Sequence, residues 1–191
     1  MFVITHIKVS ELNSFFYNLK VLEEKYLAKK IELIEEIFQF LDKVEIYFEN
    51  FGKSSKMAEI ATLKGELDTI RRGIDPKTVQ KMDVPKRELQ SAYAYTIIEK
   101  TFQILNIEHD SLFTKIEQAT ELIENILLVA LQNNLFSLPD KETNIDQSYA
   151  EQIWQLMEHH QSIFLIQKKS RLLVSQIDCI LILQKCIQHI L

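Results

Sequence analysis

The chain has 191 residues, of which 47% are hydrophobic and 26% are charged, and this balance is ordinary for one globular domain with a sizeable core. Its net charge of −5 argues against a general nucleic-acid binder, because such proteins gain affinity by neutralising phosphates. The three Gly and three Pro all lie between Gly52 and Pro139. The scarcity of these helix breakers elsewhere predicts long helices at both ends of the chain.

The first predicted helix begins at Ser10, whose short side-chain oxygen suits an N-cap, and extends to Phe51. Its apolar stripe shifts by one residue near Tyr26 and Leu27, so we expect any bend or break there. Residues 2–7 are β-branched and apolar, and we expect them to be extended or to form an isolated strand before this helix.

The middle of the chain is predicted to hold shorter helices. Gly52 is placed as the residue that ends the first helix, and Gly73 as the end of a second helix that begins at Ser54 or Ser55. Residues 73–87 are predicted to be a mobile loop with a short helix from Pro76 to about Met82. Further helices are predicted from Pro85 to about residue 107, from the cap Asp110, and from the cap Asp146.

The last thirty residues, Ser162 to Leu191, contain neither Gly nor Pro and are apolar on most of a helical wheel. This pattern predicts a helix at the centre of a bundle, with the only plausible joint at residues 167–170. Charged residues interrupt every window long enough to cross a membrane. The sequence therefore predicts an all-α, single-domain bundle over residues 1–191, with five to six helices and long N- and C-terminal helices.

The two cysteines, Cys179 and Cys186, are predicted to be free thiols. On one helix they lie about 10 Å apart, too far for a disulfide. Free thiols suit a reducing compartment, and the N-terminus lacks the pattern of a cleavable signal peptide. We therefore expect a cytoplasmic protein, while a secretion route without a cleavable signal remains open.

Signatures of enzymes and metal sites are weak in this sequence. Cys179, Cys186 and His189 are the best metal candidates, but their spacing differs from the close pairs of structural zinc sites. No Glu precedes a His by three residues, as di-iron bundles require. There is no Gly-flanked serine and no Gly-rich phosphate cradle. We therefore predict no cofactor and no metal, and we do not favour an enzyme, although a helical metalloprotein or enzyme using His and Cys is kept as a second alternative.

The charge of the chain is unevenly distributed. Residues 53–87 carry nine basic and five acidic groups, whereas both flanking segments are acidic. Such asymmetry is usual for a solvated face, but it also favours an anionic partner. Binding of nucleic acid or anionic lipid through this segment is therefore our alternative hypothesis, with these candidate residues: Arg71, Arg72, Lys77, Lys81, Lys86 and Arg87.

Aromatic residues are numerous in the first predicted helix, and four of them fall off its main apolar stripe: Phe16, Tyr17, Phe40 and Tyr47. Exposed aromatic clusters often mark interfaces, whereas a broad core face would bury the same residues. Our leading hypothesis is a non-enzymatic helical protein-interaction module (an adaptor, an assembly subunit or a secreted effector). It would bind another protein, or a second copy of itself, through helix packing.

Overall fold

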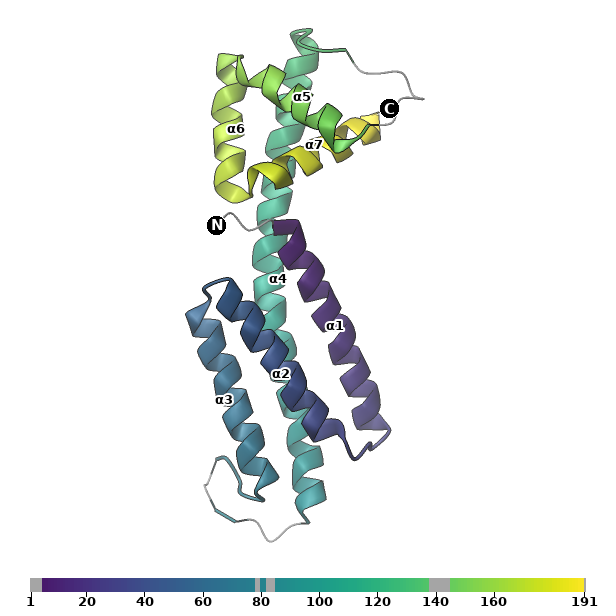
Figure 1. Ribbon diagram of the computed structural model, residues 1–191, viewed down its shortest axis with the longest axis vertical. Coiled ribbons are helices and arrows are strands. Elements are labelled where there is room, and N and C mark those ends of the chain that lie inside the picture. The colour runs from purple at the N-terminus through teal and green to yellow at the C-terminus, as the bar shows by residue number, and fades with distance from the viewer. Residues whose placement is uncertain (1–4, 78–79, 82–84, 138–144, 191) are drawn as a thin grey trace. The chain divides into compact units, whose positions relative to one another are not determined.

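The computed structural model describes residues 5–77, 80–81, 85–137 and 145–190. These residues form seven helices and no strand, so the all-α prediction is confirmed, but the expected count of five to six helices is wrong. The helices are listed here in chain order: α1 (Thr5–Leu27), α2 (Leu33–Asn50), α3 (Ser54–Arg71), α4 (Lys86–Gln132), α5 (Gln147–Glu158), α6 (Gln161–Leu173) and α7 (Gln176–Ile190) (Figure 1).

The chain divides into two compact units. Unit 1 comprises residues 1–10 and 110–191, and unit 2 comprises residues 11–109. The division falls inside α1 and inside α4, so each of these helices contributes residues to both units. The prediction of a single domain over residues 1–191 stays a prediction, since two compact units can unfold together or separately.

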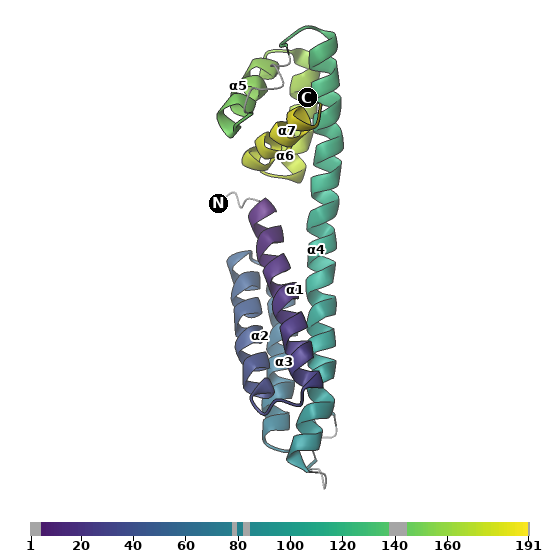
Figure 2. The ribbon, with the colours of Figure 1, turned by 90° about the vertical axis from the view of Figure 1, so that its right-hand side faces the viewer.

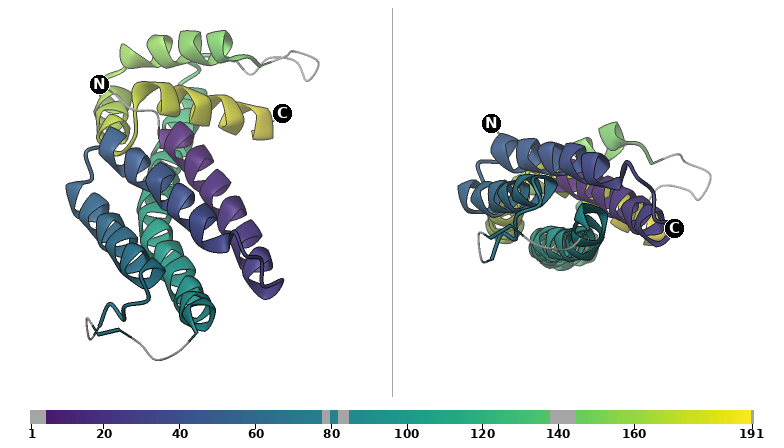
Figure 3. Two further views of the ribbon diagram at one scale, coloured as in Figure 1. Left: turned by 60° about the horizontal axis from the view of Figure 1, so that its bottom comes forward. Right: turned by 90° about the horizontal axis from the view of Figure 1, so that it is seen from below.

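Unit 2 is a bundle of four helical segments, in which α1, α2, α3 and the first part of α4 surround a common core (Figures 2 and 3). Its largest fully buried side chains come from all four segments: Leu12, Ile37, Leu41, Phe48, Ile60, Leu67, Ile70, Ile97 and Leu105. The apolar face of α2 is wide: α3 packs against it, and Phe15 of α1 contacts Phe40 and Tyr47.

Unit 1 packs α5, α6 and α7 against the later part of α4. Its core contains Trp154, Met157, Cys179 and Leu183, and α5 and α7 are neighbours (Figure 3). Both cysteines are buried and free, as expected from their spacing. Helix α7 buries one broad side in this core, whereas Ile177, Lys185 and Ile190 are exposed. It is therefore not covered all round, as the central helix predicted from the apolar wheel would be.

Four helices end in the same motif, with a residue in the left-handed conformation and a hydrogen bond from the following residue back into the last turn. For α2 the left-handed residue is Gly52 (φ 65°), and the Lys53 amide donates to the Phe48 carbonyl at 2.9 Å. Gly73 (φ 77°) ends α3 in the same way, as predicted. Asn134 ends α4, and Lys29 ends α1, each with a positive φ that glycine adopts more easily.

Three predicted helix boundaries are wrong. The break expected near residues 107–110 is absent, because α4 continues as one helix of 47 residues. The C-terminal stretch is not one helix, since α6 ends at Leu173 and the chain is extended at Val174, four residues beyond the expected joint. A further break at His159 and His160 separates α5 from α6, where no boundary was expected.

Other local predictions were closer to the structure. The break of the first predicted helix lies at residues 28–32, beside the expected position, and Asp146 caps α5 by accepting from the Tyr149 amide at 2.8 Å. Thr5 and His6 are helical rather than extended, while residues 2–4 lie outside the described residues. The short helix expected from Pro76 lies partly outside them, and Pro76 and Lys77 themselves form a turn.

Candidate binding surfaces

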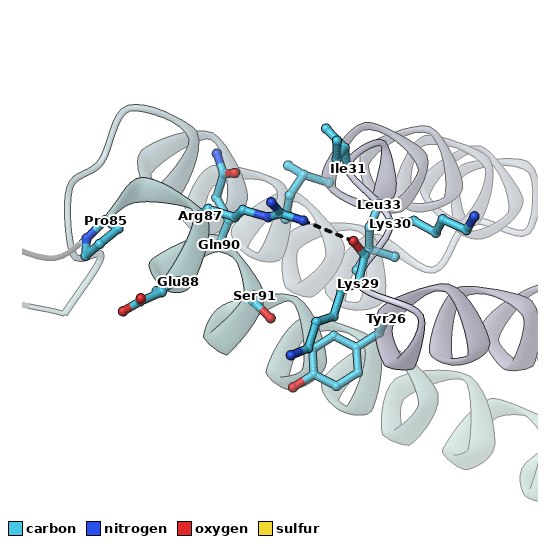
Figure 4. Close-up of a pocket in the computed structure, with 11 residues that line it drawn as sticks. Tyr26, Lys29, Lys30, Ile31, Leu33, Pro85, Arg87, Glu88, Gln90 and Ser91 are labelled. Carbon is cyan, nitrogen blue, oxygen red and sulfur yellow. Dashed lines mark hydrogen bonds between the residues drawn. The ribbon is translucent and has the colours of Figure 1, made fainter.

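A cavity of about 830 Å³ lies in unit 2, between the α1–α2 turn and the start of α4 (Figure 4). Most of its lining comes from two short segments that are far apart in the sequence. The lining residues are Tyr26, Lys29, Lys30, Ile31, Leu33, Ile34, Pro85, Arg87, Glu88, Gln90 and Ser91. Three cations and one carboxylate therefore border this cavity.

The α1–α2 turn holds its shape through backbone hydrogen bonds. The Lys30 amide donates to the Lys25 carbonyl at 3.1 Å, and Lys29 adopts a φ of 54°. The guanidinium of Arg87 donates to the Lys29 carbonyl at 3.4 Å, which joins the turn to α4 (Figure 4). A lysine in the left-handed region is uncommon, because its Cβ crowds the backbone where glycine would not.

The lysines of this turn differ in their ionic environment. Lys25 pairs with Glu36 at 2.6 Å. Lys29 and Lys30 are exposed, and neither forms an ion pair within the described part of the chain. The turn thus presents two cations whose charge no described carboxylate neutralises directly.

A second cavity, of about 410 Å³, adjoins the first and shares Ile31, Ile34 and Gln90 with it. Its charged residues are already paired. Arg71 lies 3.7 Å from Glu35, and Arg72 lies 2.5 Å from Asp68. The positive charge is therefore concentrated on the side of Lys29, Lys30 and Arg87.

Two aliphatic side chains project from the same turn into solvent. Leu27 is 71% exposed and Ile31 is 85% exposed. We call the group of Leu27, Lys29, Lys30, Ile31 and Arg87 the basic tip. It combines exposed apolar surface with unpaired positive charge, which are the two features that a binding surface for an amphipathic anionic partner requires.

Unit 1 carries a different exposed surface on α6. Ile163, Gln167 and Ser170 are buried on one side of this helix. The other side presents three apolar and two basic residues, which we call the α6 face: Phe164, Leu165, Lys168, Lys169 and Leu172. Leu172 is 86% exposed, and the Lys168 ammonium lies 4.5 Å from the centre of the Phe164 ring.

A cavity of about 630 Å³ in unit 1 is bordered by Trp154, Arg171 and Ile177, among other residues. Arg171 lies over the Trp154 ring at 5.7 Å and is paired with Glu158. The indole N–H of Trp154 is buried without a hydrogen-bond partner among the described residues. Because Glu158 neutralises Arg171, this cavity lacks the excess positive charge of the basic tip.

The four predicted aromatic contact residues have different environments. Tyr17 is 69% exposed, while Phe16 is partly buried against the rings of Phe102 and His109. Phe40 and Tyr47 are buried in the core of unit 2, where both contact Phe15, so a partner cannot reach them in this structure. The burial of Tyr47, followed by the charges of Glu108 and Glu11, holds the pKa of its phenol well above the usual range.

The predicted basic residues are only partly brought together. Arg71 and Arg72 lie at the adjoining cavity, whereas Lys77 and Lys81 are exposed on the loop before α4. Arg87 belongs to the basic tip. Lys86 begins α4, and its side chain lies outside the described part of the structure.

Sequence reasoning missed Lys29 and Lys30 because it counted charge by segment, and these lysines lie outside residues 53–87. A signal was present in Leu27-Ala28-Lys29-Lys30-Ile31. This stretch coincides with the expected break, and a break between helices exposes the residues it contains.

The metal candidates do not form a site. Cys179 and Cys186 lie in the apolar core of unit 1, where burial raises the pKa of the Cys186 thiol to about 11. His189 is exposed near the end of α7. In the described ranges, no three His, Cys, Asp or Glu side chains come close enough to hold a metal ion.

The comparisons with known proteins identify no relative: no family model, no curated protein and no solved structure matches this chain. The helices that the structure describes also include none with the length and hydropathy needed to cross a membrane.

Proposed function

We propose that this protein is a helical protein-interaction module and that the α6 face is its protein-binding surface. The observation that carries the proposal is the exposure of Leu165 and Leu172, at 58% and 86%, on a helix whose opposite side is buried. Residues seven apart lie on one side of a helix, so these two leucines can contact the same partner. The α6 face is therefore suited to receive a second helix side by side.

The charge of the α6 face selects the chemistry of the partner. Lys168 and Lys169 lie between the two leucines in the sequence, and both are exposed. A helix with leucines on one side and glutamates flanking them would complement this arrangement. We therefore propose an acidic amphipathic helix as the occupant, because a basic helix would place like charges opposite each other.

A synthetic helix provides the test. We would measure fluorescence anisotropy of a labelled 21-residue peptide with a leucine stripe and flanking glutamates, titrated with the full chain. We expect a Kd on the order of 10 µM. Replacing both lysines (K168E and K169E together) should weaken binding about tenfold or more, and Leu172→Ser should weaken it about fivefold. Leu172 is so exposed that its replacement should leave the fold intact.

The matched control reverses two other exposed lysines of unit 1, with K115E and K185E in one chain. This control should change the Kd less than about twofold. Equal weakening by both charge pairs would show general electrostatic attraction and would overturn the assignment to α6. Absence of binding at about 100 µM protein would overturn the acidic partner. A dimer in light scattering that Leu172→Ser converts to a monomer would make a second copy the occupant instead.

A further inference from the structure

We propose that the basic tip docks unit 2 on an anionic membrane surface, with Leu27 and Ile31 entering the interface and Lys29, Lys30 and Arg87 facing the lipid phosphates. This site is separate from the α6 face, and the proposal does not depend on the protein-binding function. The sequence suggested that anionic lipid binds through residues 53–87. The present proposal places the binding lysines outside that segment, in the α1–α2 turn.

The apolar component is unusual for a charged turn. Leu27 and Ile31 flank the two lysines in the sequence, and solvent reaches most of each side chain. In Figure 4, Lys30 and Ile31 point outward from the turn. Aliphatic side chains at a protruding turn gain free energy when they move from water into the acyl boundary, while adjacent lysines keep their ammonium groups at the headgroups.

The charges at the tip favour phosphates. Lys29, Lys30 and Arg87 border the cavity together with a single carboxylate, Glu88, which points away from the turn in Figure 4. Glu32 is also exposed in the turn, and Glu23 and Glu24 are exposed one to two helical turns earlier on α1. The three cations of the tip therefore act on phosphates at short range, where the groups in direct contact dominate over charges farther away. Anionic lipids attract such surfaces in proportion to the number of cations close to the bilayer.

Membrane lipid fits the tip better than nucleic acid does. Platforms for single-stranded nucleic acid combine cations with exposed aromatic rings on which bases stack. The most exposed large residues at this tip are aliphatic, and the ring that borders the cavity, Tyr26, already packs against Tyr95 at 5.6 Å. Leucine and isoleucine offer bases no stacking surface, but both partition readily into lipid.

The backbone of Lys29 provides an independent argument. Its φ of 54° is a conformation in which glycine is favoured, and the two glycines that end α2 and α3 show the usual solution in this same chain. A lysine at this position makes the fold less stable than a glycine would. Among the described residues, its ammonium makes no ion pair that would compensate for this loss. Local strain of this kind is typical of functional positions, and here the strained residue carries an exposed cation.

Vesicle co-sedimentation of the full chain tests the proposal. Vesicles of phosphatidylcholine with roughly 30% phosphatidylserine should bind the protein at least about tenfold more strongly than pure phosphatidylcholine in 0.1 M salt. Raising the salt to about 0.5 M should weaken binding about tenfold or more, because screening reduces the phosphate attraction.

Paired substitutions separate the two components. Reversing the tip lysines with K29E and K30E should reduce binding by about twentyfold or more, whereas reversing Lys20 and Lys43, exposed lysines of the same unit, should reduce it less than threefold. Removing the apolar groups with L27S and I31S should reduce binding about tenfold. The matched control, Y17S with I46S, alters other exposed apolar residues of unit 2 and should have little effect.

Lys29→Gly distinguishes loss of binding from loss of folding. Glycine relieves the left-handed backbone and removes one cation, so the melting temperature should rise by about 2 °C while vesicle binding falls about fivefold. A variant that is destabilised, or that binds vesicles as well as the wild type, would contradict the role assigned to this residue.

Three other results would overturn the proposal. Equal binding to neutral and anionic vesicles would remove the role of the cations. Full displacement by millimolar glycerophosphoserine, together with normal binding of L27S and I31S, would indicate a pocket for a soluble phosphate group rather than surface docking. Tighter binding to a 20-nucleotide RNA than to the anionic vesicles would make nucleic acid the ligand.

Discussion

One carboxylate in unit 1 accepts hydrogen bonds at the beginnings of two helices, α1 and α7. Asp178 and Ser175 cap α7 reciprocally, since the Ser175 hydroxyl donates to the carboxylate at 2.7 Å and accepts from the Asp178 amide at 3.2 Å. The same carboxylate accepts from the Thr5 and His6 amides at 2.7 and 3.0 Å, and its other side-chain partner is His6 Nδ1 at 2.6 Å. Asp178 is fully buried, so every one of these bonds matters to the fold.

These contacts contribute to the acid response of the protein. Burial alone would raise the pKa of Asp178, but the hydrogen bonds from His6, Ser175 and Thr5 outweigh it and hold the pKa well below its ordinary value of 3.8. At pH values between the folded and the unfolded pKa of Asp178, this carboxyl is ionised in the folded protein but protonated in the unfolded chain. The stability that Asp178 contributes is therefore complete above about pH 4 and is lost as the pH falls further.

Asp178→Asn should lower the free energy of unfolding by about 2 to 3 kcal/mol at pH 7, because an amide cannot accept all of these bonds and adds buried donors. Urea titrations between pH 2 and pH 7 should also show a shallower pH dependence for the variant than for the wild type. Asp146→Asn is the control, since this exposed cap keeps its acceptor in the amide form. Parallel curves for wild type and Asp178→Asn would contradict the assignment.

At the scale of elements, two glycines of unit 2 should respond in opposite directions to the same substitution. A Cβ added at Gly65 or Gly52 meets no atom within 4 Å, so steric overlap cannot make the two substitutions differ in their effect on stability. Gly65 is an exposed interior residue of α3, and Gly65→Ala should stabilise the protein by about 0.5 to 1 kcal/mol. Gly52 has a φ of 65°, and Gly52→Ala should destabilise by about 1 kcal/mol. Thermal unfolding of both variants tests this, and a shift of equal sign would contradict it.

The sequence predicted helix ends where the backbone itself carries the signal. Gly52 and Gly73 need the left-handed conformation, and Asp146 supplies a capping oxygen, so these three boundaries could be recognised locally. The α6–α7 break was also readable, because Ser175 and Asp178 form the spacing of a reciprocal cap. Its apolar surroundings concealed it, since the helical periodicity continues across the break.

The continuity of α4 could not be predicted in this way. Asp110 is a favourable cap only where the chain leaves the helix, and tertiary packing decides whether it does. Here Glu108 is buried in unit 2 and pairs with Lys53 at 3.1 Å, which holds this turn in place. The binding surfaces were hidden for a similar reason. The basic tip joins Lys29 to Arg87, 58 residues away, and Phe40 and Tyr47 are covered by helices whose positions the sequence does not reveal.

At the scale of the whole molecule, α1 and α4 each belong to both units, and this should couple the unfolding of the two units. α4 supplies Ile97 and Leu105 to the core of unit 2 and Ile123 and Ile126 to the core of unit 1. α1 begins in unit 1 and contributes Leu12 and Leu19 to unit 2. Melting α4 therefore removes part of both cores, and melting α1 removes Leu12 and Leu19 from unit 2 together with the Thr5 and His6 hydrogen bonds to Asp178 in unit 1. We therefore expect a single cooperative transition, as a single domain would show.

The one tryptophan makes this expectation measurable, because Trp154 lies in the core of unit 1 and its fluorescence reports that unit. Leu67 is fully buried in α3, which belongs to unit 2 alone, and Leu67→Ala should cost about 2 to 5 kcal/mol. If the units unfold together, this distant substitution should lower the urea midpoint of Trp154 fluorescence by about 1 M or more, in step with circular dichroism. An unchanged fluorescence midpoint, with only the circular dichroism transition displaced, would mean that the shared helices do not couple the two cores.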